Sequence, residues 1–345
     1  MNLKDLQLNL QRRNEPVYRL AQAKRAFYSE LLAGWDALTT FPGQLKDGLA
    51  SDIPWDALQT VKLVESARGD TAKALFACAD GAAVEAVLMR HETGRNTVCV
   101  SSQAGCAMGC AFCATGAMGL RRNLTADEIA EQVIYFARQL KARQVHVTNV
   151  VFMGMGEPFN NYGEVMAAVR LLNDPEGFNL GARHMTVSTC GIPPGIRKLA
   201  DEKLQVNLAI SLHAASDGLR DSLMPVNRAF PLAELMAAVD EYTARTNRKV
   251  LFEYLLIAGV NDSDQAAEDL ARLLEHNPRL FQVNLIKYHQ TGKFAPSPPD
   301  RRERFMQILR DRGIPVTFRV SFGEDIDAAC GQLALKSTNG QEAQE

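Results

Sequence analysis

The chain has 345 residues, of which 46% are hydrophobic and 23% are charged, and its formal net charge is −2. This composition is typical of a globular protein and excludes a low-complexity chain, and no apolar run approaches the roughly 18 residues of a membrane span. The first residues are polar and lack the apolar centre of a secretion signal, so we expect a cytoplasmic protein with reduced cysteines and no membrane partner. The small net charge does not exclude nucleic acid as a partner, because local patches decide such binding.

Residues 1–57 are predicted to form a small helical domain. Residues 16–32 have the spacing of an amphipathic helix, whereas residues 41–49, with one proline and two glycines, are expected to interrupt the helices. The excess of basic side chains in residues 1–30 fits either an RNA-binding surface or an ordinary solvated helix face. Six basic residues stand there against three acidic ones: Lys4, Arg12, Arg13, Arg19, Lys24 and Arg25 against Asp5, Glu15 and Glu30.

Residues 58–96 are predicted to be a short β-rich connecting segment. Strand patterns lie at 60–67, 72–79 and 83–90, with turns between them, and a further strand pattern at 96–102 leads into the next region.

From residue 97 to residue 336, strand and helix patterns alternate. A capping box of Thr125 and Glu128 opens the first helix, at 124–140. Six such units indicate a parallel sheet covered by helices, and they favour a partial (β/α)6 barrel of the TIM type over a short open sheet. Residues 337–345 are expected to be a disordered tail. The later strand patterns lie at 145–154, 184–191, 206–214, 249–257 and 281–289, and the later helix patterns at 162–172, 193–200, 232–246, 264–276 and 302–313.

Three cysteines crowd into the loop after the first barrel strand, at Cys106, Cys110 and Cys113. Thiolates select zinc or iron–sulfur clusters, but a structural zinc site needs a fourth protein ligand, and none stands near at conventional spacing. In a barrel, chemistry collects at the carboxyl ends of the strands. The trio therefore favours an iron–sulfur cluster with one iron left open.

The C-x3-C-x2-C spacing, with Phe112 before the last cysteine, resembles the signature of the radical S-adenosylmethionine (SAM) superfamily, and "MGMGEP" at 153–158 resembles its glycine-rich stretch. This resemblance implies a 4Fe-4S cluster on the three cysteines, whose free iron binds SAM. SAM would then be cleaved to methionine and a 5′-deoxyadenosyl radical. The implied fold is a radical SAM barrel with a small N-terminal helical accessory domain and a short β extension.

Four stretches, "CVSSQAGCAMGCAFCATG", "NVVFMGMGEP", "NLAISLHA" and "GEDIDAACGQLA", are together similar to the RlmN/Cfr family of 23S rRNA adenosine methyltransferases. The RlmN branch methylates C2 of an adenosine in the peptidyl-transferase centre and also acts on tRNA; the Cfr branch methylates C8 and confers antibiotic resistance. We expect the C2 reaction, with tRNA left open as a second substrate. The resemblance also implies an external electron donor of the flavodoxin type, and we expect a monomer.

Two distant cysteines acquire roles from the same resemblance. On the residues alone, Cys99 and Cys330 could each be a small buried hydrophobe. The family implies that one SAM methylates Cys330, that the radical from a second SAM activates this methyl group for addition to adenine, and that Cys99 releases the product by forming a disulfide with Cys330. Glu85 matches a candidate proton acceptor, or is a surface carboxylate on a strand edge. Cys78 and Cys190 are expected to be structural.

The SAM contacts are carried over from the family in the same way. Gly156 and Glu157 would hold the amino group, and Ser188 would meet the ribose or the carboxylate. The chain departs from the family in "KYHQ", where a histidine stands in place of the usual asparagine. Further residues expected in this pocket are Phe112, Ser211, Leu212, His213 and His289.

Two other classes of protein compete with this hypothesis. An iron–sulfur redox or binding protein would keep the three clustered cysteines but would need neither Cys99 nor Cys330. A zinc-stabilised RNA-binding module would need a closed metal site.

Overall fold

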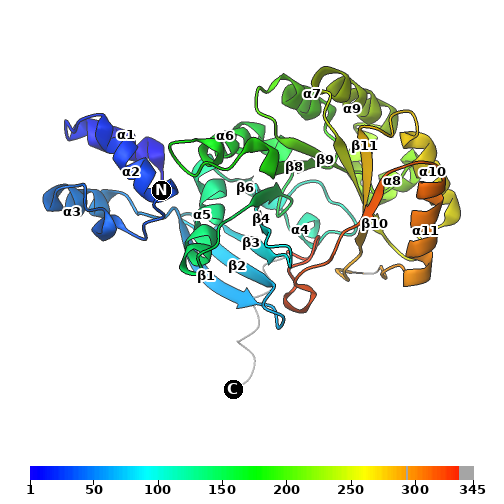
Figure 1. The fold of residues 1–345 in the computed structure, drawn as a ribbon, viewed down its shortest axis with the longest axis horizontal. Coiled ribbons are helices and arrows are strands. Elements are labelled where there is room, and N and C mark those ends of the chain that lie inside the picture. The colour runs from blue at the N-terminus through cyan, green and yellow to red at the C-terminus, as the bar shows by residue number, and fades with distance from the viewer. Residues whose placement is uncertain (293, 334–345) are drawn as a thin grey trace.

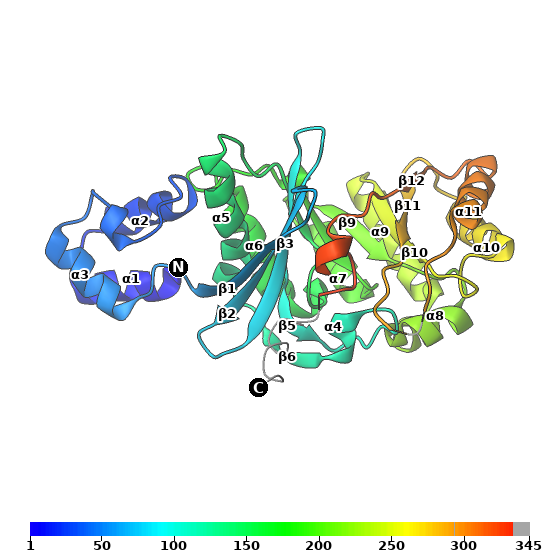
Figure 2. The ribbon, with the colours of Figure 1, turned by 90° about the horizontal axis from the view of Figure 1, so that it is seen from below.

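The computed structural model describes residues 1–292 and 294–333, so the tail predicted at 337–345 lies outside the described residues. Figures 1 and 2 show one large curved sheet, with helices along its outer side and a separate group of helices at one end. The predicted α/β fold with a mostly parallel sheet is confirmed. No helix in the described ranges combines the length and the apolar character needed to cross a bilayer.

Ten strands form the main sheet, in the order β1-β2-β3-β4-β7-β8-β9-β10-β11-β12. The pairs from β4 onward are parallel, and those among β1 to β4 are antiparallel, so the β extension continues the barrel sheet. The strands are β1 Leu58–Glu65, β2 Thr71–Cys78, β3 Ala83–Arg90, β4 Asn96–Cys99, β7 Asn149–Phe152, β8 Met185–Thr189, β9 Asn207–Ser211, β10 Val250–Leu256, β11 Phe281–Lys287 and β12 Val316–Phe318.

Six of the parallel strands, β4 and β7 to β11, are those predicted for the barrel. Their apolar runs form strands because both faces are covered; in β9, residues 208–210 are fully buried. The prediction missed β12, which adds a seventh parallel strand. It also missed a separate antiparallel hairpin of β5 (Gln103–Cys106) and β6 (Gly119–Asn123), whose connection carries the cysteine loop.

The barrel helices follow their strands as predicted. The capping box at the start of α5 is present, with Thr125 Oγ1 accepting from the Glu128 amide at 3.2 Å and the Glu128 carboxylate accepting from the Thr125 amide at 2.9 Å. The helices of this region are α4 Ala114–Ala117, α5 Ala126–Ala142, α6 Tyr162–Asn173, α7 Pro193–Asp201, α8 Asp217–Leu223, α9 Leu232–Thr246, α10 Asp264–Leu274 and α11 Pro299–Asp311.

The N-terminal residues form α1 (Leu3–Arg12), α2 (Tyr18–Tyr28) and α3 (Gly43–Asp52). The interruption predicted at 41–49 is wrong, because α3 begins within it. Pro42 stands directly before the first turn, where an amide hydrogen would have no partner inside the helix. These helices pack against α5, where the Arg138 guanidinium lies 5.0 Å from the ring centre of Phe27.

The segment after β12 returns across the open side of the sheet (red in Figure 1). It reaches the β extension, where Lys73 Nζ donates to the Asp327 carbonyl at 3.0 Å. It also reaches the cysteine loop, where the Ala114 amide donates to the Gly331 carbonyl at 2.8 Å. Contacts from the β extension and from the cysteine loop therefore fix the position of Cys330.

Candidate active site

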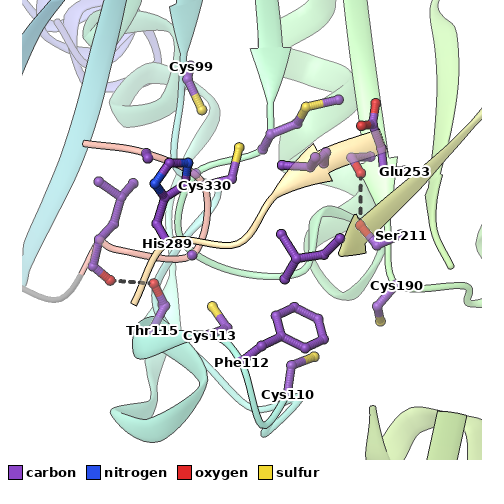
Figure 3. Close-up of a pocket in the computed structure, with 18 of the residues that line it drawn as sticks. Cys99, Cys110, Phe112, Cys113, Thr115, Cys190, Ser211, Glu253, His289 and Cys330 are labelled. Atoms are coloured by element: carbon purple, nitrogen blue, oxygen red, sulfur yellow. Dashed lines mark hydrogen bonds between the residues drawn. The ribbon is translucent and has the colours of Figure 1, made fainter. Parts of the chain in front are cut away.

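A cavity opens between the carboxyl ends of the parallel strands and the returning C-terminal segment, and Figure 3 shows part of its lining. The structure brings twelve of the fourteen predicted site residues to this cavity. They are Cys99, Cys106, Cys110, Phe112, Cys113, Gly156, Glu157, Ser188, Ser211, His213, His289 and Cys330.

The cysteine loop is held by short local contacts. Gly105, before the first cysteine, has φ of +79°, and a Cβ there would lie 2.0 Å from the Gly119 carbonyl oxygen, so the hairpin requires glycine. The Cys113 amide donates to the Cys110 carbonyl at 3.1 Å, and the Ala111 amide donates to the Leu223 carbonyl at the end of α8 at 2.9 Å. These bonds turn the loop into the cavity.

Burial raises the pKa of Cys106 to about 11, and it raises the pKa of Cys110 further, with the neighbouring Cys113 and Cys106 thiolates as the next causes. Three adjacent thiolates are therefore stable only when positive charge lies between them. Among the described residues, no three His, Cys, Asp or Glu side chains are arranged to hold a single metal ion. The soft donors of the three cysteines fit an iron–sulfur cluster.

The glycine-rich stretch after β7 passes close to the strand that precedes the cysteine loop. Gly156 has φ of +100°, and a Cβ at this position would lie 2.6 Å from Gln103 Cβ. A Cβ on Gly154 would lie 2.8 Å from the Val100 carbonyl oxygen. Both positions need glycine for this close approach, which brings Glu157 to the cavity wall.

The carboxylate of Glu157 is buried and already ordered by backbone donors. The Cys190 amide donates to it at 2.7 Å and the Phe159 amide at 2.9 Å. Burial raises its pKa, and these two hydrogen bonds oppose that rise. A carboxylate fixed in this way at a cavity wall can accept a hydrogen bond from an ammonium group.

Ser188 and Ser211 end neighbouring strands, with their hydroxyl oxygens 3.4 Å apart. His213 follows in a left-handed conformation, with φ of +57°. Its Nδ1 accepts from the Leu255 amide at 3.0 Å, and burial, followed by the charge of Arg220, lowers its pKa to about 3. The imidazole is therefore neutral and carries its proton on Nε2.

His289, at the position where the chain departs from the family, lines the cavity. Its Nε2 lies 3.0 Å from Ser321 Oγ in the C-terminal segment. Leu212 lies elsewhere: it is fully buried and is not among the lining residues, and its amide donates to the Glu253 carbonyl at 3.0 Å.

Cys99 and Cys330 point into the same space from β4 and from the C-terminal segment, as Figure 3 shows. Burial raises the pKa of Cys99 to about 12, with the Cys330 thiolate as the second cause and the charge of Arg319 opposing both. Cys99 is therefore a thiol at neutral pH.

The surface reading of Glu85 is wrong, because only 1% of this residue is exposed. It is also not among the residues that line the cavity. Its carboxylate pairs with Lys73 Nζ at 3.1 Å, and the same lysine binds the Asp327 carbonyl three residues before Cys330. In this structure Glu85 supports the C-terminal segment through Lys73.

Sequence reasoning missed two charged residues of the cavity wall, Glu253 in β10 and Arg319 after β12. It also missed the fully buried Arg220 in α8. The sequence signal that could have found them is a single charged residue inside an apolar strand pattern, such as Glu253 in "VLFEYLL". Cys190, expected to be structural, lies in the cavity wall, whereas Cys78 is buried outside it.

Comparison with known proteins adds independent findings. The model of the Radical SAM superfamily matches residues 100–271. A solved radical SAM methyltransferase from Sphaerobacter thermophilus superposes with a TM-score of 0.92 at 49% identity, over 96% of this chain and 97% of that one.

Two curated relatives are each called a probable dual-specificity RNA methyltransferase RlmN. The one from Chloroflexus aurantiacus is 50% identical, over 96% of this chain and 91% of its own length. The one from Bacillus mycoides is 42% identical, over 97% and 92%.

The fold and the cavity are those of a radical SAM enzyme, which uses an iron–sulfur cluster and SAM. More narrowly, the chain belongs to the RlmN family of RNA methyltransferases. The resemblance seen in the sequence is thereby confirmed, and the two competing classes, the redox protein and the zinc module, are set aside.

Proposed function

We propose that the protein methylates C2 of an adenosine in 23S rRNA through an S-methylcysteine at Cys330. The observation that carries this proposal is that Cys99 and Cys330, 231 positions apart, line one cavity with the three clustered cysteines. A redox or binding protein that merely holds a cluster has no use for this second pair.

The three clustered cysteines would hold a 4Fe-4S cluster with one iron open to SAM. When bound, the cluster and two SAM molecules per turnover supply a methyl group and a radical that abstracts hydrogen. Glu157, fixed by two backbone amides, would accept from the amino group of SAM. Phe112 packs edge-on against His213 with ring centres 4.8 Å apart, and together they would form an ordered wall beside the cofactor.

Cys330 and Cys99 would have different roles in the reaction. Cys330 Sγ carries the methyl carbon and, after this carbon adds to adenine, links the protein to the base. The Cys99 thiol gives up its proton as its sulfur attacks Cys330 Sγ: a sulfur–sulfur bond forms, and the bond from Cys330 Sγ to carbon breaks. Its electron pair stays on the carbon, which takes up a proton as the methyl group of the product. An external reductant returns the disulfide to two thiols.

The base that takes the ring proton has to reach the cavity. Glu85 stays a proposal for this role, but its carboxylate would have to leave Lys73 to fill it. The ion pair between Lys73 and Glu85 would be broken in that movement, so the assignment is testable. Lys73→Met should change the rate at which the ring proton is lost, and it should change SAM binding less.

The RNA substrates and partners are proposed from the relatives. The relatives are called dual-specificity RNA methyltransferases, which supports two kinds of RNA substrate, and we propose that these are rRNA and tRNA. Methylation at C8, the reaction of the Cfr branch, is the alternative outcome at the same adenosine. We also propose a flavodoxin-type electron donor and a monomeric enzyme, with residues 1–57, 58–96 and 97–336 as accessory domain, connection and core.

The test uses Cys99→Ala in the cluster-loaded enzyme with RNA and SAM. The variant should methylate Cys330 and add to adenine, and should then stop because nothing displaces Cys330 from carbon. Mass spectrometry should find an oligonucleotide on the peptide containing Cys330.

Cys330→Ala and the double variant should give no adduct, because the methyl carrier is absent, and Cys78→Ala should turn over normally because Cys78 lies outside the cavity. A Cys99→Ala enzyme that cleaves SAM and carries methylated Cys330, yet forms no adduct, would overturn the mechanism. For the wild type, the methyladenosine isomer found by mass spectrometry decides between C2 and C8.

A further inference from the structure

Glu253 is a buried carboxylate in the cavity wall for which the reaction described above has no role. It lies in the middle of β10, is 3% exposed and lines the cavity. The strand register places it opposite Ser211 on β9 and opposite Asn284 on β11. Figure 3 shows Glu253 and Ser211 on the same side of the cavity.

Only one of its two carboxylate oxygens has a hydrogen-bond partner among the described residues, although the charge of Arg319 also acts on the carboxylate. Oε1 accepts from Asn284 Nδ2 at 3.1 Å. Oε2 is shielded from solvent and has no hydrogen-bond partner among the described residues. A buried carboxylate oxygen without a donor is costly, so the cavity is complementary to a ligand that supplies one.

The surroundings of Oε2 indicate what kind of donor fits. Ser188 and Ser211, with hydroxyl oxygens 3.4 Å apart, lie on the strands next to β10. A carboxylate beside hydroxyl groups suits a sugar diol, since carboxylates accept from ribose hydroxyls in nucleotide sites. Cys99 and Cys330 occupy a different part of the cavity, as Figure 3 shows, and the substrate base has to reach that part.

We propose that Glu253 Oε2 accepts a hydrogen bond from a ribose hydroxyl of SAM, and that Glu253 is a cofactor-binding residue of this enzyme. Asn284 orients the carboxylate by holding Oε1, so that Oε2 faces the ligand. This inference rests on the proposed SAM site and adds a contact on β10 to it.

The experiment measures binding of S-adenosylhomocysteine and its 2′-deoxy and 3′-deoxy derivatives to the cluster-loaded protein by calorimetry. A hydrogen bond to a charged acceptor makes the wild type lose roughly 10- to 100-fold in affinity for one of the two deoxy derivatives. In Glu253→Met, which has a side chain of similar length without an acceptor, that difference should disappear. Glu253→Gln, the change least disturbing to the fold, should reduce it by placing an amide nitrogen at the position of Oε2.

Two controls separate this inference from the proposed site as a whole. Glu157→Gln should weaken all three ligands by a similar factor and keep the difference between them, because it would act on the amino group. Glu241→Met, an exposed change on α9, should alter nothing. Failure of the wild type to bind S-adenosylhomocysteine would refute the SAM site. If the wild type binds S-adenosylhomocysteine normally but binds all three ligands with equal affinity, the role of Glu253 alone is refuted. The same holds if both Glu253 variants are folded and still distinguish the deoxy derivative as strongly as the wild type does.

Discussion

At the scale of single residues, the cavity wall contains backbone conformations that few side chains adopt. His213 has φ of +57° and Gly156 has φ of +100°. Glycine adopts such a conformation without strain, whereas a histidine keeps it only where the surrounding structure fixes it. Here a side-chain bond to the Leu255 amide fixes the first, and close contact with Gln103 fixes the second.

His213 should make stability depend on pH. Its pKa is lowered to about 3, so below pH 6.5 the unfolded chain binds a proton that the folded protein does not. The free energy of unfolding therefore decreases as the pH is lowered from 7. His213→Asn keeps an acceptor near the position of Nδ1 and tolerates a positive φ. Urea denaturation of cluster-free protein should therefore show a loss between pH 7 and pH 5 that is about 2 kcal/mol smaller in this variant. His184→Asn, at an exposed site, should behave as the wild type does, and equal slopes in all three proteins would contradict the prediction.

Gly156→Ala should damage both stability and the SAM site. The new Cβ would meet Gln103 at 2.6 Å in a backbone conformation unfavourable to alanine, at a cost of roughly 3 kcal/mol. Urea denaturation and calorimetry with S-adenosylhomocysteine measure the two effects. Gly163→Ala is the matched control, because this helical glycine has open space around its Cβ position and alanine favours helices. Unchanged stability and affinity in Gly156→Ala would show that the loop adapts.

At the scale of elements, apolar runs and caps were enough to predict the barrel strands and α5, because covered parallel strands leave a continuous signal. The β5–β6 hairpin gave no such signal: it is short, and its geometry depends on the approach of Gly105 to Gly119. The helix α3 was missed because proline and glycine, here Pro42 and Gly43, are as typical of a loop as of the start of a helix. The side of the sheet on which Glu253 lies was also not predictable, because it depends on the pairing of β10 with the neighbouring strands.

Arg220 in α8 links two of the site's loops from inside the protein. Its guanidinium donates to the Cys190 carbonyl at 2.6 Å and to the Leu212 carbonyl at 3.2 Å, and it binds Asn227 Oδ1 at 2.8 Å. Arg220→Met should leave buried acceptors unpaired, lower the free energy of unfolding by about 3 kcal/mol and weaken S-adenosylhomocysteine binding. Denaturation and calorimetry test this, with exposed Arg228→Met as a control that should change neither quantity. A stable Arg220→Met protein with wild-type affinity would rule out the linking role.

At the scale of the whole molecule, the C-terminal segment joins parts of the chain that the sequence leaves far apart. The meeting of Cys99 with Cys330 could be expected only from the family resemblance, since no pattern in either segment encodes it. The N-terminal helices are also joined to the barrel, through Arg138 with Asp56 at 2.8 Å and the Lys141 bond to the Glu30 carbonyl at 2.6 Å. Removing residues 1–57 would therefore expose part of the core, and point changes are the better test of their function.

The basic excess of the N-terminal residues is largely neutralised within the fold. Arg13, Arg19, Lys24 and Arg25 each form an ion pair with a carboxylate. In the part of the chain that the structure describes, Lys4 and Arg12 are exposed and form no such pair. If this domain grips RNA, these two charges are the ones free to meet phosphates.

The double change Lys4→Glu and Arg12→Glu should then weaken RNA binding and make it less sensitive to salt. Each phosphate contact contributes about −0.7 to the slope of log affinity against log salt for single strands, so the slope should become shallower by about 1.4. Filter binding over a salt series measures this, and unchanged iron content and S-adenosylhomocysteine affinity show that the barrel is intact. Arg25→Glu is the control: its charge is already paired with Glu30 at 3.2 Å, so it should alter the slope much less. Equal slopes for the double variant and the wild type would mean that RNA does not contact the N-terminal helices at these positions, and that the RNA grip lies elsewhere, nearer the cavity.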